Sequence, residues 1–183
     1  PLSELGWQQM HSSVGTHKPW NRIISSPLSR CQAFALDLGD RLQLPVDINP
    51  EFREISFGIW EGLSVKELMK SEPKALRNYW QDPDKHAPEG SELMSDFVVR
   101  IHTAWDKLVS DHQDEHTLLV CHGGVIRAIL TRVLGMPKDK LWNIDVPYAN
   151  VSRLIYHHFP DGGETAQLQF HQAQFHQAQF HQV

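Results

Sequence analysis

The chain has few of the features that mark unusual protein classes. Only two of its 183 residues are cysteine, which excludes a disulfide-rich secreted framework and is typical of a reducing compartment. It has no apolar run near the ~20 residues that a membrane helix needs, and it does not open with a signal-peptide pattern. Acidic residues outnumber basic ones, 22 to 17, so no basic face for nucleic acid or anionic lipid is expected. These absences favour a cytoplasmic protein without nucleic-acid or membrane partners.

What is present fits one α/β domain. Short apolar stretches at residues 22–25, 45–48 and 117–121 predict strands. A helix is predicted after the first of them, at 26–38, and an apolar helix after the last, at 125–134. A further helix is predicted from Ser91. The stretch at 117–121 is apolar throughout, as in a strand buried on both faces. We therefore expect a mostly parallel sheet with helices on both faces. A turn at 160–163 between two alternating segments predicts an antiparallel C-terminal edge hairpin.

Two helix starts carry specific signals. Ser26 is expected to cap the helix after the first strand, with Pro27 in its first turn and Gly39 near its end. Ser64 and Glu67 form a capping-box pattern that predicts another helix. A helix at 73–81 is expected to follow it.

The C-terminal residues 169–183 repeat Phe-His-Gln-Ala-Gln with a period of five. Neither a strand nor a helix with this period turns His171, His176 and His181 toward one metal ion. We interpret the segment as a low-complexity tail after a domain covering 1–168, with no metal site and no cofactor.

The strongest chemical signal is VCHGGVIR at residues 120–127. It places His122 between a buried strand and a helix N-terminus, the edge at which open α/β sheets bind ligands. Gly123 lets an anion approach the backbone N–H groups of that helix. The alternative is that His122 is merely hydrogen-bonded within a strand-to-helix turn.

Two further segments carry candidate residues. SSPLSRC, at 25–31, places Arg30 in the first turn of a helix, where a bound anion would offset its unfavourable position near the helix dipole. FREISFGIWEG, at 52–62, places Glu54 beside aromatic residues that can raise the pKa of a carboxyl group. The alternatives are a solvated Arg30 and a Glu54 that points to water.

Together these motifs resemble the phosphatase branch of the histidine phosphatase superfamily, over residues 1–159. The resemblance implies that Arg30 clamps the transferred phosphoryl group, that His122 and Gly123 bind its oxygens, and that Glu54 is the general acid. It implies a small phosphorylated substrate and a phosphohistidine intermediate formed without a metal. SSPLSRC and the FGxWEG loop are most similar to the alpha-ribazole phosphatases of cobalamin synthesis.

One motif of that family is missing. The Arg-His-Gly segment that holds its nucleophilic histidine does not occur here, since the only His-Gly pair is His122–Gly123. We expect the nucleophile, a second clamping arginine and a central strand to belong to a segment outside this sequence. Three functions stay open: alpha-ribazole 5′-phosphate phosphatase, a broad-specificity phosphatase of the family, or a non-catalytic protein that binds a phosphorylated ligand.

Overall fold

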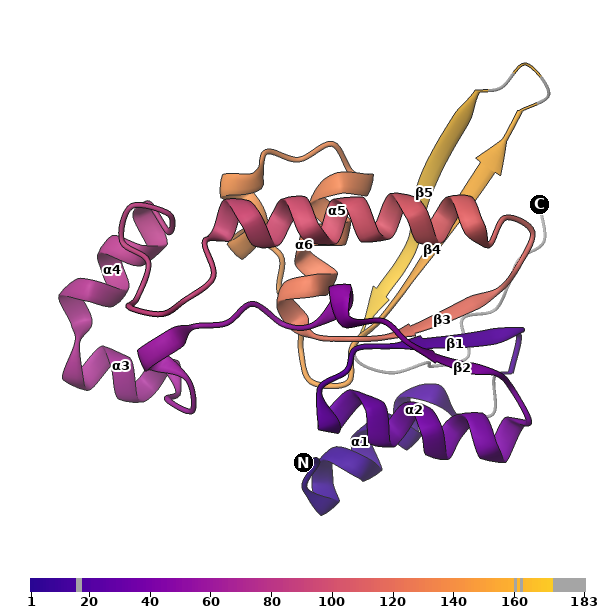
Figure 1. Ribbon diagram of the computed structural model, residues 1–183, viewed down its shortest axis with the longest axis horizontal. Coiled ribbons are helices and arrows are strands. Elements are labelled where there is room, and N and C mark those ends of the chain that lie inside the picture. Colours follow the sequence, from indigo (N-terminus) through magenta and orange to yellow (C-terminus); the bar gives the residue numbers. More distant parts are fainter. Residues whose placement is uncertain (16–17, 160, 162, 173–183) are drawn as a thin grey trace.

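A parallel sheet of three strands lies at the centre of the computed structural model, which describes residues 1–15, 18–159, 161 and 163–172 (Figure 1). The strands are β1 (Arg22–Ser25), β2 (Val46–Ile48) and β3 (Thr117–Val120), in the order β2-β1-β3. Both neighbours run parallel to β1. The carboxyl ends of β1 and β3 therefore meet at one edge of the sheet.

Helices cover both faces of this sheet, as the sequence predicts (Figure 1). The helices α1 (Glu4–Val14) and α2 (Ser29–Leu42) pack on one face with Ile23 of β1. The helices α5 (Met94–Asp111) and α6 (Gly123–Val133) pack on the other face with Ile24. Because successive strand residues point to opposite faces, neighbouring isoleucines contribute to two separate hydrophobic clusters.

The C-terminal hairpin consists of β4 (Val151–His158) and β5 (Glu164–Gln172), paired antiparallel. It confirms the predicted hairpin, and the α/β fold class is confirmed as well. The hairpin forms a sheet of its own, and within the described residues it is not hydrogen-bonded to the parallel sheet. β5 continues to Gln172, four positions past the expected domain end at 168. His176 and His181 lie outside the described residues.

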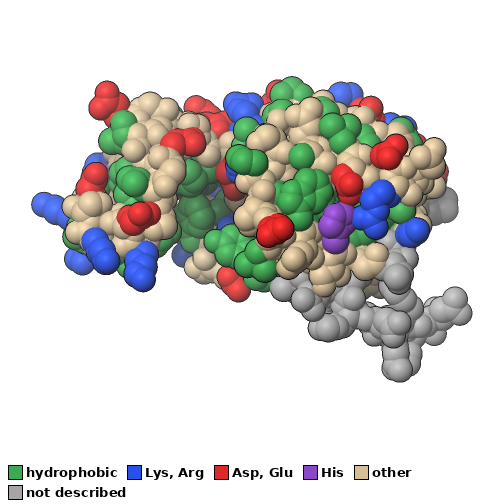
Figure 2. All heavy atoms as spheres, turned by 90° about the horizontal axis from the view of Figure 1, so that it is seen from below, with side chains coloured by type: hydrophobic (Ala, Val, Ile, Leu, Met, Phe, Trp, Pro, Cys, Tyr) green, Lys and Arg blue, Asp and Glu red, His purple; other side chains and the backbone are tan. Residues whose placement is uncertain are grey.

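Two short helices, α3 (Val65–Ser71) and α4 (Pro73–Gln81), form a lobe at one end of the molecule (Figure 1). The predicted capping box is confirmed, because Ser64 and Glu67 each bond the other's backbone N–H. Seen from below, hydrophobic side chains lie in the recess between this lobe and the larger body (Figure 2). Short 3₁₀ helices lie at Pro50–Phe52 (η1), Gly58–Trp60 (η2) and Lys138–Asn143 (η3).

The predicted cap of α2 is wrong. The helix begins at Ser29, its N-cap is Leu28, and no side chain caps it. Pro27 precedes the helix, and the hydroxyl of Ser26 instead bonds the ring of His122. The predicted helix end is wrong too: α2 continues to Leu42, and Gly39 lies within it. Among the described residues, no helix has the length and apolar character to cross a membrane.

Candidate active site

His122 lies at the junction of β3 and α6, where it is the N-cap of the helix in extended backbone conformation. Its side chain is buried, with 6% of its surface exposed. Its Nε2 is 2.6 Å from the Oγ of Ser26, which follows β1 directly. The ring also contacts the thiol of Cys31, 3.6 Å from Nδ1. His122 is thus held between the ends of two neighbouring strands.

Burial makes this histidine neutral. Burial and, to a smaller extent, the positive charge of Arg30 together lower the pKa of His122 to about 3. A neutral imidazole has one nitrogen that donates and one that accepts. Burial also raises the pKa of Cys31 to about 12, so this neighbour is a neutral thiol. Both cysteines are free.

Glu54 reaches the same place from the loop between η1 and η2. Its Oε2 accepts a hydrogen bond from the backbone N–H of Gly124 at 3.1 Å, and its Oε1 accepts one from Ile55 at 3.2 Å. Burial raises the pKa of Glu54, and these two bonds and the charges of Arg30 and Arg127 offset part of that rise. The carboxyl is therefore a better proton donor near neutral pH than an exposed one.

Gly124 permits this approach of Glu54 to the start of α6. A Cβ at position 124 would lie 2.3 Å from Oε1 of Glu54, closer than real Cβ contacts come. The loop itself is fixed by its apolar residues, since Phe52, Ile55 and Trp60 are all buried. The aromatic residues that flank Glu54 in the sequence thus anchor the segment that presents it.

Arg30, the second residue of α2, is exposed. Its positive charge acts on both His122 and Glu54. Arg30, Glu54, His122 and Gly123 all line one cavity of about 1030 Å³. The structure therefore brings together the four residues singled out in the sequence, and their catalytic roles stay a prediction.

Two contributors were missed by the sequence analysis. Ser26 was assigned to a helix cap, although its hydroxyl bonds His122. Arg127 lies one helical turn after Gly123, donates from Nε to the carbonyl of Ile144 at 2.8 Å, and stacks over Trp142 at 5.6 Å. The spacing of four from Gly123 could have indicated Arg127, because residues i and i+4 share a helix face. Nothing in the local sequence indicates the partner of Ser26.

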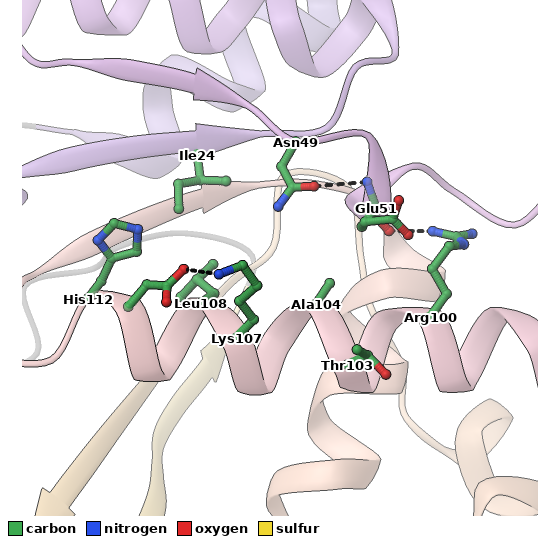
Figure 3. A pocket seen from close by; sticks show the side chains of 10 residues that line it. Ile24, Asn49, Glu51, Arg100, Thr103, Ala104, Lys107, Leu108 and His112 are labelled. Carbon is green, nitrogen blue, oxygen red and sulfur yellow. Dashed lines mark hydrogen bonds and ion pairs between the residues drawn. The ribbon is translucent and has the colours of Figure 1, made fainter.

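A second cavity, of about 510 Å³, lies between α5 and the end of β1 (Figure 3). None of the four predicted site residues lines it. Its cations already have protein partners: Arg100 bonds Glu92 and the carbonyl of Glu51, and Lys107 pairs with Asp111 at 2.7 Å. No cluster of metal ligands is found in the described part of the chain. His171 bonds Ser152 and the carbonyl of Asp145.

Comparison with known proteins extends these observations. The model of the histidine phosphatase superfamily, branch 1, matches residues 1–168. A glucosyl-3-phosphoglycerate phosphatase of Mycolicibacterium vanbaalenii is 34% identical over 173 residues, covering 88% of this chain and 76% of that protein. The adenosylcobalamin/alpha-ribazole phosphatase of Escherichia coli is 32% identical over 125 residues, covering 68% of this chain and 61% of that protein.

Solved structures of phosphatases are also similar to this chain. The mycobacterial glucosyl-3-phosphoglycerate phosphatase in complex with VO3 matches with a TM-score of 0.77 and 27% identity, covering 93% of this chain and 86% of that one. The chain spans 64% of the length of a curated relative from Hydrogenobacter thermophilus and 46% of one from Mycobacterium bovis. A family model that matches residues 1–168, with relatives of this identity, decides the assignment. The chain belongs to branch 1 of the histidine phosphatase superfamily.

Proposed function

We propose that this chain supplies the phosphate-binding and acid groups of a phosphomonoester hydrolase that works through a phosphohistidine intermediate. The observation that carries the proposal is the gathering of Arg30, Glu54 and His122 around one cavity at the carboxyl ends of β1 and β3. A guanidinium and an imidazole can stabilise the charge on phosphoryl oxygens, and a carboxyl of raised pKa can protonate a departing oxygen.

Each group has a distinct part in the proposed reaction. Arg30 neutralises the phosphoryl charge, while the ring of His122 and the backbone of Gly123 position its oxygens. A histidine nitrogen outside this sequence attacks phosphorus, and the P–O bond to the alcohol breaks. Glu54 gives its proton to the departing oxygen, and water then hydrolyses the phosphohistidine to inorganic phosphate.

The proposed substrate is a small alkyl phosphate, with alpha-ribazole 5′-phosphate as the first candidate. The similarity to the Escherichia coli adenosylcobalamin/alpha-ribazole phosphatase supports this choice. The comparable similarity to a glucosyl-3-phosphoglycerate phosphatase supports the broader alternative, a phosphatase of wide specificity. The missing Arg-His-Gly motif supports a third alternative, a protein that binds a phosphorylated ligand without hydrolysing it. A cytoplasmic location stays a prediction.

The test compares the chain alone with the chain extended at its N-terminus by an apolar strand that ends in Arg-His-Gly. We expect no turnover of p-nitrophenyl phosphate by the chain alone, and turnover by the extended form. In the extended form, Glu54→Gln should slow hydrolysis of an alkyl phosphate by about 10²–10⁴-fold, the range for general acid catalysis. Hydrolysis of the aryl phosphate should slow far less, because its leaving group needs little protonation.

Two results would contradict the proposal. Turnover by the chain alone that is abolished by His122→Ala would show that the nucleophile is already present. An equal loss on alkyl and aryl substrates in Glu54→Gln would assign Glu54 to binding or structure, not to proton transfer.

A further inference from the structure

The ring of His122 is bonded by a hydroxyl that follows the neighbouring strand. β1 and β3 lie side by side (Figure 1), and the backbone N–H of Ser26 donates to the carbonyl of Val120 at 2.9 Å. The Oγ of Ser26 is 2.6 Å from Nε2 of His122, and it accepts a hydrogen bond from the N–H of Leu28 at 3.3 Å. Ser26 is 0% exposed, so its hydroxyl proton needs an acceptor within the protein.

These contacts determine the direction of the bond between Ser26 and His122. A serine hydroxyl has one proton to donate and two lone pairs that accept. One lone pair takes the N–H of Leu28, so this contact does not use the proton. Among the described residues, Nε2 of His122 is the one acceptor that bonds this hydroxyl. If Nε2 carried a proton, the hydroxyl proton would be buried without an acceptor, which is costly. Ser26 is therefore the donor and Nε2 the acceptor.

An imidazole that accepts at Nε2 carries its proton on Nδ1. Burial keeps the ring of His122 neutral, and a neutral imidazole has one N–H. The thiol of Cys31 lies 3.6 Å from Nδ1 and 3.7 Å from Nε2, and it donates its own proton to the carbonyl of Cys121 at 3.4 Å. Toward the ring, Cys31 offers only sulfur, a weak acceptor. The N–H of Nδ1 is therefore available to a stronger acceptor.

The lining of the large cavity indicates which ring nitrogen a ligand meets. His122 and Cys31 both line the cavity of about 1030 Å³, whereas Ser26, which covers Nε2, does not. Arg30 and Gly123 line the same cavity, so an anion placed there also meets a guanidinium and the N-terminus of α6. A charged phosphate oxygen accepts far more strongly than a thiol sulfur. Such an oxygen would take the hydrogen bond from Nδ1–H.

We propose that Ser26 is a positioning residue: its hydroxyl donates to Nε2 of His122, holds the ring proton on Nδ1, and so presents Nδ1–H to an oxygen of a phosphate in the cavity. The opposite tautomer would turn a lone pair toward the phosphate, whose charged oxygens also offer only lone pairs. The hydroxyl thus decides whether His122 attracts or repels this ligand. That the phosphate is a group transferred from a substrate rests on the function proposed above.

Nitrogen-15 NMR of the 183-residue chain tests the tautomer directly. The protonated and unprotonated nitrogens of a neutral imidazole resonate far apart, and Nε2 is recognised because it couples strongly to both carbon-bound ring protons. The signals that disappear in His122→Asn assign the ring. At about pH 7 we expect a proton on Nδ1 and none on Nε2, without averaging between the two forms. Added inorganic phosphate should shift Nδ1 and its proton and leave Nε2 nearly unchanged.

Two neighbouring serines provide a matched pair of variants. Ser26→Ala removes the donor to Nε2, so the ring should exchange between its two tautomers. The affinity for inorganic phosphate, measured by calorimetry, should then fall by about 2- to 12-fold, the equivalent of one neutral hydrogen bond. Ser25→Ala removes an equally buried hydroxyl, which donates to the carbonyl of Ser26 at 2.9 Å and not to the ring. It should leave both the tautomer and the affinity unchanged.

Ser26→Thr is the conservative variant, because it keeps the hydroxyl and should retain both the Nδ1–H tautomer and the affinity for phosphate. Urea unfolding checks that each variant folds. If threonine does not fit this buried position, the two alanine variants decide.

The outcomes separate the role of Ser26 from the proposed reaction. A proton on Nε2, or a single Nδ1–H tautomer that persists in Ser26→Ala, overturns the role of Ser26. Phosphate that does not bind the unaltered chain, binds without shifting Nδ1, or binds Ser26→Ala equally well overturns the binding through Nδ1–H. A fixed tautomer with phosphate bound at Nδ1, but no hydrolysis by the chain extended with Arg-His-Gly, supports the role of Ser26 and contradicts the proposed function.

Discussion

At the scale of single residues, burial gives His122 a clear signature in the pH dependence of stability. Its folded pKa of about 3 lies below the ordinary value of 6.5. Between these values the unfolded chain binds a proton that the folded chain does not. The free energy of unfolding therefore falls as the pH falls through this window, by up to about 1.4 kcal/mol per pH unit from this group.

We predict that His122→Asn flattens this dependence. Urea unfolding measured from about pH 7 down to about pH 4 should show a shallower loss of stability than in the unaltered chain. His116→Asn, which removes an exposed histidine, is the matched control and should leave the slope unchanged. Parallel slopes for His122→Asn and the unaltered chain would show that His122 takes up its proton in the folded state.

Neighbouring glycines at the start of α6 give a second residue-scale prediction. A Cβ at Gly123 would meet the flexible end of Arg127 at 3.0 Å and make an ordinary contact with Val146 at 3.9 Å, whereas a Cβ at Gly124 would displace the carboxylate of Glu54. Both positions lie in the first turn of α6, so the two changes to alanine alter helix propensity alike. Gly124→Ala also breaks the bond to Glu54, so it should be less stable than Gly123→Ala by about 1.5–3 kcal/mol.

Urea unfolding of the two variants measures that difference. Repeating the pair in a Glu54→Ala background provides the control, since the difference should vanish once the carboxylate is gone. A difference that persists there would show that Gly124 is required by the backbone and not by Glu54.

The sequence identifies residues that stand in ordered motifs, but it does not identify the residues that they contact in the fold. Arg30, Glu54 and His122 could be selected because each follows a recognisable strand, loop or strand-to-helix junction. The role of Ser26 could not, because a serine before a proline is also the usual start of a helix. Only the pairing of β1 with β3 places Ser26 beside His122, and that pairing is not local in sequence.

At the scale of elements, α2 and β2 pack too closely for a side chain at Gly39. A Cβ there would lie 2.2 Å from Cγ2 of Val46. This contact explains a glycine within a helix, where the sequence alone suggested a helix end. Gly39→Ala should therefore destabilise the fold by about 1–3 kcal/mol through overpacking, despite its better helix propensity.

A compensating change tests the cause. Val46→Ala removes the methyl groups in the way, so the double variant should recover most of the stability that Gly39→Ala loses in thermal or urea unfolding. If the double variant is as unstable as the sum of the two single changes, the cost does not come from this contact.

Elements with local signals were predicted well. The helix after Ser64 begins at its capping box, and α4 occupies the predicted residues. β3 was expected to be buried on both faces, but residues 117–119 are only half-buried. Their apolar character is that of a central strand, whereas within the described residues β3 pairs with β1 alone and borders the large cavity on its other side. The amino-acid composition of a strand indicates how buried the strand should be, but it does not show whether a neighbouring strand is present to bury it.

At the scale of the whole molecule, few contacts join the parallel sheet to the C-terminal hairpin. β1 lies between two strands, and its Ile23 and Ile24 are 0% and 5% exposed. The hairpin reaches the main core through partly buried Leu154 and Tyr156. Sequence alternation predicted the hairpin, but whether it joins the parallel sheet depends on contacts between distant segments, which no local pattern contains.

This organisation predicts uneven resistance to local opening. Amides of β1 should exchange with solvent most slowly, those of β3 faster, and those of β4 fastest, with about tenfold or more between β1 and β4, because β1 is paired on both edges and enclosed by both cores. Hydrogen exchange measured by mass spectrometry on peptides from the three strands tests the order. Equal exchange of β1 and β4 would show that the hairpin opens only when the whole domain unfolds.

The bond between Trp105 and Tyr156 provides a way to separate the hairpin from the core. The indole Nε1 donates to the tyrosine hydroxyl at 2.7 Å, linking α5 to β4. Trp105→Phe keeps most of the apolar contact and removes this bond, worth about 0.5–1.5 kcal/mol. Exchange in β4 should then accelerate by about 2- to 12-fold while β1 stays unchanged, since a local opening responds only to the contacts it breaks. Faster exchange in both strands would instead show that Trp105 stabilises the cooperative core and that the hairpin unfolds together with that core.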